Sequence, residues 1–249
     1  MKHECVEMLK QLTGKKYVVI TKRGNRSIKL SLRKAKELGK KELLIQDQGG
    51  WITYRQFGEE LGFNITELKT NHGLIENVPK ADILIVNSMT GYFAMQDMEK
   101  LSKEDIFLIN DASGSIGTEQ AKFGDIILGS FGRWKPINLE SGGFIAMDNK
   151  EYLPEDENVE LDYTILYNKL KGLGERLEMF NELNKKIKNE LKEFEIIDGE
   201  GINVVVKFKN DEEKNKIINY CERNKYEYVL CPKEIRVLEY AISIEVKRT

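Results

Sequence analysis

The sequence lacks the features that mark several classes of protein. Its 249 residues include three cysteines, Cys5, Cys221 and Cys231, and no CxxC pair. This pattern argues against a disulfide framework and against a structural zinc site, so three buried thiols are the simpler interpretation and no metal site is expected. A chain of this length has room for one large domain or two modest domains with a substantial hydrophobic core.

The sequence also lacks a strong charge excess and long apolar runs. Lys and Arg number 39 and Asp and Glu number 41, a formal net charge of −2, so electrostatic capture of nucleic acid is not expected. Apolar runs such as Ile83–Val86 and Ile126–Leu128 are far shorter than the roughly 20 residues that cross a bilayer, and the amino terminus has no apolar signal core. We therefore expect a soluble, cytoplasmic protein without a membrane partner.

What the sequence does contain, from Tyr17 to Met147, is an alternation of β-branched and aliphatic runs with amphipathic segments. This order predicts an α/β fold, with a mainly parallel sheet covered by helices. The expected strands are Tyr17–Ile20, Glu42–Gln46, Asp82–Val86, Ile106–Asn110, Asp125–Gly129 and Gly143–Met147. The expected helices, in which apolar residues recur at helical spacing, are Ser27–Leu38, Thr53–Leu61 and Met95–Leu101.

The composition changes around Glu151–Glu160, where Pro154 and several acidic residues are typical of a solvated connector. We expect a domain boundary here, with residues 1–154 forming a large domain and residues 155–249 a small α+β domain. The leucine spacing of Tyr163–Phe194 predicts a long linking helix, interrupted at Gly172 or Gly174.

The rest of the expected small domain consists of short elements joined by loops of ordinary length. They are a strand at Ile202–Phe208, a helix at Asp211–Asn224, and strands at Tyr226–Leu230 and Ala241–Lys247.

Two expected strands are followed by residues that could carry chemistry. Asp111 stands at the end of one strand, where ligands bind in open α/β sheets, but an Asp at this position is also a common helix cap. Lys135 follows a Gly-Ser-Phe-Gly loop, yet a single lysine is more often a solvated surface charge than a nucleophile. Each residue alone is therefore a weak indication, and the argument depends on their order and spacing.

Taken together, these segments resemble the fold-type I pyridoxal 5'-phosphate (PLP) enzymes of the aspartate aminotransferase superfamily, in particular its DegT-type branch of sugar aminotransferases. That branch has a Ser-Phe pair, a lysine five positions after the serine, and a Gly-Gly pair seven and eight positions after the lysine. The matching residues here are Ser130, Phe131, Lys135, Gly142 and Gly143. The resemblance covers roughly Tyr17–Met147 and implies a sheet of the seven-stranded type, sandwiched by helices.

The resemblance implies PLP as the cofactor and gives three residues a role. Lys135 would form the internal aldimine and then move the proton at the substrate α-carbon. Asp111 would keep the pyridine nitrogen protonated, so that the ring withdraws electrons. Trp51 would lie on the face of the ring, although a tryptophan of the core or of an interface is the alternative.

The cofactor phosphate would be bound at the start of the first helix of the large domain. Gly24, Asn25 and Arg26 lie where the family places its phosphate-binding turn, and the hydroxyl of Ser130 would assist them. Arg26 could instead simply face solvent. Near the carboxyl terminus, Arg236 is a candidate for binding a substrate carboxylate, with Arg248 as a competing candidate and surface ion pairing as a competing role.

The sequence departs from the DegT-type pattern in three respects. Ser141 replaces a Glu, and Gly114 replaces a His or Gln that contacts the cofactor. The usual member of the branch is also considerably longer. We expect an aminotransferase that acts on a small-molecule amino donor and acceptor, and the resemblance implies a homodimer.

Other interpretations stay open. A PLP-dependent lyase or desulfurase would use the same cofactor, and a noncatalytic binding protein could keep the same fold. A nicotinamide oxidoreductase is also conceivable because Gly114 and Gly117 follow a strand. However, Ala112 stands at the first glycine position of GxGxxG, and the preceding strand comes too late in the chain for an opening βα unit.

Overall fold

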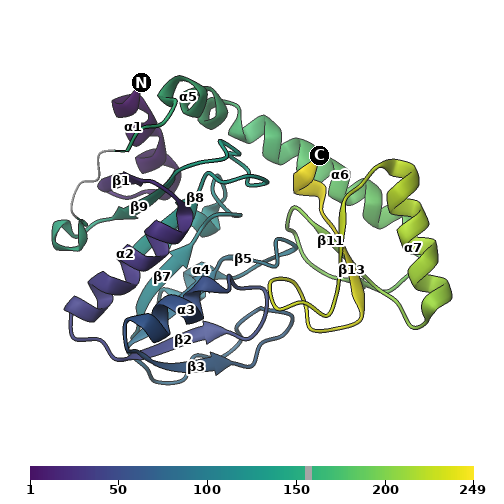
Figure 1. Cartoon of the computed structure of the whole chain (residues 1–249), viewed down its shortest axis with the longest axis horizontal. Helices are drawn as coiled ribbons and strands as arrows, with labels where there is room; N and C mark the ends of the chain where they lie inside the picture. Colours follow the sequence, from purple (N-terminus) through teal and green to yellow (C-terminus); the bar gives the residue numbers. More distant parts are fainter. Residues whose placement is uncertain (155–158) are drawn as a thin grey trace.

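The computed structural model describes residues 1–154 and 159–249 (Figure 1). Its centre is a seven-stranded sheet with the order β1-β9-β8-β7-β4-β2-β3. Strand β9 is antiparallel to both of its neighbours, and the other strands are parallel to one another. The strands are β1 (Tyr17–Thr21), β2 (Glu42–Gln46), β3 (Asn64–Leu68), β4 (Ile83–Asn87), β7 (Phe107–Asp111), β8 (Ile126–Ser130) and β9 (Gly143–Met147). The predicted mainly parallel sheet is thus confirmed.

Helices cover both faces of this sheet because its strands are apolar on both sides. In β8, Ile126 and Leu128 belong to the hydrophobic cluster under α2 (Gly24–Glu37) and α3 (Thr53–Glu60). The intervening Ile127 points to the opposite face and packs in the cluster of α1 (Lys2–Thr13) and α5 (Tyr163–Lys171). This alternation is the two-residue period of a strand. The short α4 (Met98–Leu101) packs in a third cluster, on β4 and β7.

The carboxyl-terminal part contains a four-stranded antiparallel sheet in the order β10-β11-β13-β12. Its strands are β10 (Ile196–Ile197), β11 (Val204–Lys207), β12 (Tyr228–Leu230) and β13 (Ala241–Ile244). Helices α6 (Leu173–Glu190) and α7 (Asp211–Asn224) pack in one cluster with this sheet. Gly172 separates α5 from α6, at one of the two glycines where an interruption was predicted.

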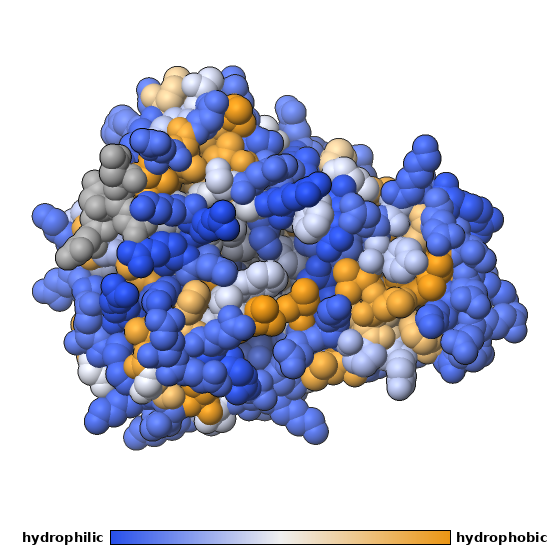
Figure 2. Space-filling view, viewed as in Figure 1, coloured by the Kyte–Doolittle hydropathy of each residue, from blue (hydrophilic) through white to orange (hydrophobic). Residues whose placement is uncertain are grey.

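Short elements complete the chain: the hairpin β5 (Met89–Thr90) and β6 (Ala94–Met95), and the 3-10 helices η1 (Glu119–Lys122), η2 (Lys150–Tyr152) and η3 (Val246–Arg248). Phe93 and Ala94 of the hairpin pack with Val205 and Ala241 of the smaller sheet, so the hairpin joins the two sheets. On the face in Figure 2, hydrophilic side chains predominate and a group of apolar ones lies over β11 and β13. Residues 155–158 of the acidic connector, and the boundary expected there, lie outside the described residues.

The topology brings three polar residues to one edge of the large sheet. Asn87, Asp111 and Ser130 end the neighbouring strands β4, β7 and β8, and Asn87 is directly opposite Asp111 in the register. The carboxyl-terminal sheet lies beside this edge (Figure 1). Within the two described ranges, no helix combines the length and the apolar character needed to cross a membrane.

Candidate active site

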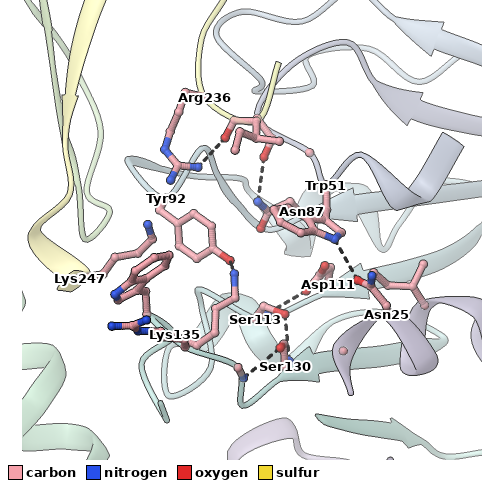
Figure 3. A pocket seen from close by; sticks show the side chains of 18 of the residues that line it. Asn25, Trp51, Asn87, Tyr92, Asp111, Ser113, Ser130, Lys135, Arg236 and Lys247 are labelled. Carbon is pink, nitrogen blue, oxygen red and sulfur yellow. Dashed lines mark hydrogen bonds between the residues drawn. The ribbon is translucent and has the colours of Figure 1, made fainter. Parts of the chain in front are cut away.

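A cavity of about 420 Å³ lies at this edge of the large sheet. It is lined by the ends of β4, β7 and β8, the start of α2, and residues before and after β13 (Figure 3). The predicted site residues that line it are Gly24, Asn25, Trp51, Asp111, Ser130, Lys135 and Arg236. Arg26 is the predicted residue that is missing from the lining, within the part of the chain that the structure describes.

Lys135 enters the cavity from a loop that hydrogen bonds hold in place. The loop closes through Leu139 N–H, which donates to Phe131 O at 2.7 Å, while Trp134 N–H donates to Asn138 Oδ1 at 2.9 Å. Trp134 has a left-handed backbone (φ 63°), a conformation that is unfavourable for a residue with a Cβ. The Lys135 amine donates to the hydroxyl of Tyr92 and lies 5.4 Å from the ring centroid of Trp51 (Figure 3).

Asp111 is 5% exposed and is held by two donors. The Tyr54 hydroxyl donates to Oδ2 at 2.6 Å, and Ser113 N–H donates to Oδ1 at 3.0 Å. Burial, together with the charge of Asp111, raises the pKa of Tyr54 well above its ordinary value, so Tyr54 stays a donor. Tyr54 and Ser113 thus fix the orientation of the carboxylate, which lines the cavity.

The start of α2 lies unusually close to the end of β8. A Cβ at Gly24 would lie 2.5 Å from Ser130 Cβ, so any other residue at position 24 would push the two elements apart. Arg26 and Ser27 N–H donate to Arg23 O, and the N–H groups of Gly24 and Asn25 precede this first helical bond. Such first-turn N–H groups, with the positive end of the helix dipole, form an anion site.

Trp51 is fixed to this helix start by a hydrogen bond from its indole Nε1 to Asn25 Oδ1, at 3.0 Å. The bond sets the orientation of the ring on the side of the cavity that faces Lys135. Asn25 therefore positions Trp51 with its side chain, while its backbone lies at the helix end.

Sequence reasoning missed several lining residues, including Asn87, Tyr92, Ser113 and Lys247. Asn87 could have been found by the rule that singled out Asp111, because it also ends a strand at this edge. Ser113 Oγ accepts the N–H of Ser130 at 3.0 Å and so ties two strand ends together. Tyr92 lies in a two-strand hairpin that no pattern in the sequence predicts.

Arg236 lies at the cavity wall but is already paired. It is 4% exposed, and its Nε and Nη2 donate to Oε1 and Oε2 of Glu245 at 2.7 and 2.6 Å. Lys247 is 3% exposed and also donates to Glu245. The sequence predicts that this arginine binds a substrate carboxylate; in the structure two of its nitrogens donate instead to the carboxylate of Glu245.

The buried charges shift one another's pKa values. Burial alone would raise the pKa of Glu245, but the hydrogen bonds and charges of Arg236 and Lys247 outweigh it and lower the pKa to about 2. Burial and the positive charges of Arg236 and Lys135 lower the pKa of Lys247 to about 7, against the attraction of Glu245. These shifts favour an ionised Glu245 and make Lys247 give up its proton more readily than an exposed lysine does.

The structure also bears on the other interpretations. All three cysteines are buried, and burial raises the pKa of the Cys221 thiol to about 12 and also raises those of Cys5 and Cys231. The segment after β7 continues as turns and η1, not as the α-helix of a dinucleotide-binding unit. Over residues 1–154 and 159–249, no group of three His, Cys, Asp or Glu is placed to hold a metal ion.

No family model matches the chain, and no curated protein matches its sequence. Solved structures do match. A DegT DnrJ EryC1 StrS aminotransferase from Brucella abortus has a TM-score of 0.76 at 14% identity, covering 98% of this chain and 84% of that chain. The E. coli GDP-4-keto-6-deoxy-D-mannose-3-dehydratase with bound hydrated PLP has a TM-score of 0.78 at 13% identity, covering 97% and 86%.

A third similar structure is 3-amino-5-hydroxybenzoic acid synthase, with a TM-score of 0.74 at 12% identity, covering all of this chain and 86% of that chain. Identities this low show the fold alone. The predicted fold is therefore confirmed: the chain has the fold of DegT-type and related sugar-modifying enzymes, over most of their length.

Proposed function

We propose that this protein is a PLP-dependent enzyme and that it is an aminotransferase. The observation that carries the proposal is that one cavity holds the carboxylate of Asp111, at the end of β7, and the amine of Lys135, from the loop that follows the adjacent strand β8. The solved structures with this fold support it, because they include an aminotransferase and an enzyme with bound PLP.

The residues present fit PLP. A volume of about 420 Å³ is in the range of small-molecule sites, roughly 300 to 1,000 Å³. Asp111 is the one acidic side chain among the described residues of the lining, which suits a cationic ring nitrogen. The glycine at position 24 leaves the helix start and the Ser130 hydroxyl close together, as a phosphate group would require.

When bound, PLP supplies an aldehyde that bonds to amines and a ring that withdraws electrons from the attached carbon. In our proposal Lys135 would hold that aldehyde and, with an amino substrate bound, would take and return the proton at the substrate carbon. Asp111 would accept a hydrogen bond from the ring nitrogen, and Trp51 would pack against the ring. Gly24, Asn25 and Ser130 bind the phosphate, with Arg26 as a second-rank candidate because it lies outside the lining.

The reaction we propose is amino transfer between a small-molecule donor and acceptor. Desulfuration is disfavoured because it needs a reactive thiol, and all three thiols are buried with raised pKa values. Elimination is the second candidate, since one structure of this fold is a PLP-binding dehydratase. Arg236 remains a proposed carboxylate ligand through Nη1, which Glu245 does not contact and which donates one hydrogen bond to Ile235 O at 2.8 Å.

We also propose a homodimer in the cytoplasm. Twofold pairing is the commonest form of oligomer. Three free cysteines suit a reducing compartment. Light scattering of the purified protein would give the mass that decides between one chain and two.

The test is a half-reaction. Purified protein is loaded with PLP, and amino donors are added without acceptor while the visible spectrum is recorded. An aminotransferase converts PLP to its amine form and releases the keto product of the donor. A lyase would regenerate the original spectrum and release an elimination product. A protein that binds no PLP at all would exclude both activities.

A further inference from the structure

Tyr92 lies at the tip of the β5–β6 hairpin, in a conformation that its surroundings impose. Its φ is 66°, a left-handed value that is unfavourable for a tyrosine, and the side chain is buried. Tyr92 N–H donates to Met89 O at 2.9 Å, and Tyr92 O accepts the N–H of Asn203 at 2.8 Å. The hairpin and the carboxyl-terminal part of the chain therefore both hold its backbone.

The ring of Tyr92 occupies space that a glycine leaves open. A Cβ at Gly114 would lie 3.0 Å from Cδ1 and Cε1 of Tyr92, and equally close to Met89 Cβ. Contacts this short require neighbours to move. Position 114, three residues after Asp111, thus has no side chain of its own, and the aromatic ring from the hairpin fills that part of the site.

Three cations surround the ring. The amines of Lys135 and Lys247 lie 4.5 and 4.6 Å from its centroid, and the guanidinium of Arg236 lies 5.5 Å away. Cations at such distances are attracted to the face of an aromatic ring. Figure 3 shows Tyr92 between Lys135 on one side and Lys247 and Arg236 on the other.

The hydroxyl of Tyr92 adds a directed contact because it accepts a hydrogen bond from the Lys135 amine. A lysine amine is carried on four flexible carbons, so an unheld amine samples many positions. One acceptor at a fixed place removes much of that freedom before any ligand arrives, which is the basis of preorganisation.

We infer that Tyr92 is the positioning residue of Lys135: its hydroxyl holds the reacting amine in the cavity, and its ring links that amine to Arg236 and Lys247 of the carboxyl-terminal part. The inference rests on the proposed function for its catalytic consequence, but the placement of the amine belongs to the protein itself. Gly114 contributes to this arrangement because the absence of a side chain there leaves room for the Tyr92 ring.

The test compares Tyr92→Phe, which keeps the ring and removes the hydroxyl, with the parent protein. The control is Tyr220→Phe, which removes a hydroxyl bonded to Glu190 between α6 and α7, away from the cavity. In protein without cofactor, a water-soluble acylating reagent is added, and peptide mass spectrometry follows modification of Lys135 against the exposed Lys103. We expect Tyr92→Phe to speed the labelling of Lys135 several-fold and Tyr220→Phe to leave it unchanged.

In the PLP-loaded enzyme, Tyr92→Phe is expected to lower kcat by about tenfold to a hundredfold, the equivalent of one hydrogen bond to a charged group. KM for the amino donor should change little, and the pH profile of kcat should shift. Gly114→Ala, which presses on the ring but keeps the hydroxyl, should give a smaller effect in the same direction, and it decides the matter if Tyr92→Phe fails to fold.

Unchanged labelling and unchanged kcat in Tyr92→Phe would overturn the inference. If Gly114→Ala has to stand in for it, the same two unchanged results there would do so. If the parent protein attaches no PLP, the proposed function fails, while the labelling rates still decide whether Tyr92 holds the amine.

Discussion

Asp111 meets two donors within the protein, Tyr54 and Ser113, and its remaining hydrogen-bonding capacity faces the cavity. These two hydrogen bonds fix the orientation of the carboxylate before any ligand binds. In the proposed function this carboxylate is the partner of the protonated ring nitrogen. Substitutions that keep the shape of the side chain but change its charge or its hydrogen bonds test this role of Asp111 directly.

We expect Asp111→Asn to fold and to bind PLP but to lower turnover by about 10²- to 10³-fold, because a neutral amide stabilises a cationic ring poorly. Tyr54→Phe is the matched control: it keeps the charge, loses one donor, and should cost about tenfold or less. Steady-state rates and PLP titrations measure both. Equal turnover in Asp111→Asn and the parent would contradict the assigned role.

The lowered pKa of Lys247 predicts how the free energy of unfolding changes with pH. Its pKa is about 7 in the folded protein against an ordinary value of 10.5, so between these pH values the unfolded chain binds a proton that the folded chain does not. The free energy of unfolding should therefore rise with pH across this window, by at most about 1.4 kcal/mol per pH unit from this group. Urea unfolding of the parent and of Lys247→Met, in which this contribution is absent, measures the difference. Parallel curves for the two proteins would refute it.

At the scale of helices and strands, the sequence was informative wherever burial was strong. The predicted helix Asp211–Asn224 is found with the same bounds, and six of the seven strands of the large sheet were predicted to within one residue. Strand β3 was missed because Asn64–Leu68 is a mostly exposed edge strand with few apolar residues. Helix α1 was missed as well, although it buries Cys5 and Leu9.

The residues of the candidate site also fall into those that the sequence predicts and those that it does not. Asp111 and Lys135 could be found because a motif and a strand end mark them. Tyr92 could not, since its place depends on a left-handed turn and on the space beside Gly114, both of which are tertiary features. Likewise, only the fold shows that Arg236 donates two hydrogen bonds to Glu245.

The contact between α2 and β8 predicts the effect of one added methyl group. Gly24→Ala places a Cβ 2.5 Å from Ser130 Cβ, so the helix start must move. We expect a loss of about 1–3 kcal/mol in the free energy of unfolding, together with weaker binding of PLP. In α6, Gly174→Ala meets no atom within 4 Å and should instead stabilise by about 0.5–1 kcal/mol. Unfolding curves of both variants test the contrast, and equal shifts would refute it.

For the molecule as a whole, helix α5 joins the large domain by packing. Leu166 and Leu170 are buried in one cluster with Cys5 and Leu9 of α1, whereas Phe180 of α6 packs with the smaller sheet. The division expected from the sequence at 154/155 would separate α5 from that cluster. We expect a fragment of residues 1–172 to be more stable than one of residues 1–154 by about 3–6 kcal/mol, the burial of two leucines. Thermal unfolding of the two fragments measures this, and equal stability would show that α5 adds nothing.

The proposed function depends on which amine would bind PLP, and two lysines line the cavity: Lys135, which is half-buried, and Lys247, which is buried. The most direct measurement is to load the protein with PLP, reduce it with borohydride, digest it, and map the labelled peptide by mass spectrometry. We predict a single label on Lys135 and no label in Lys135→Ala. A label on Lys247, on a surface lysine, or on none at all would contradict the central claim.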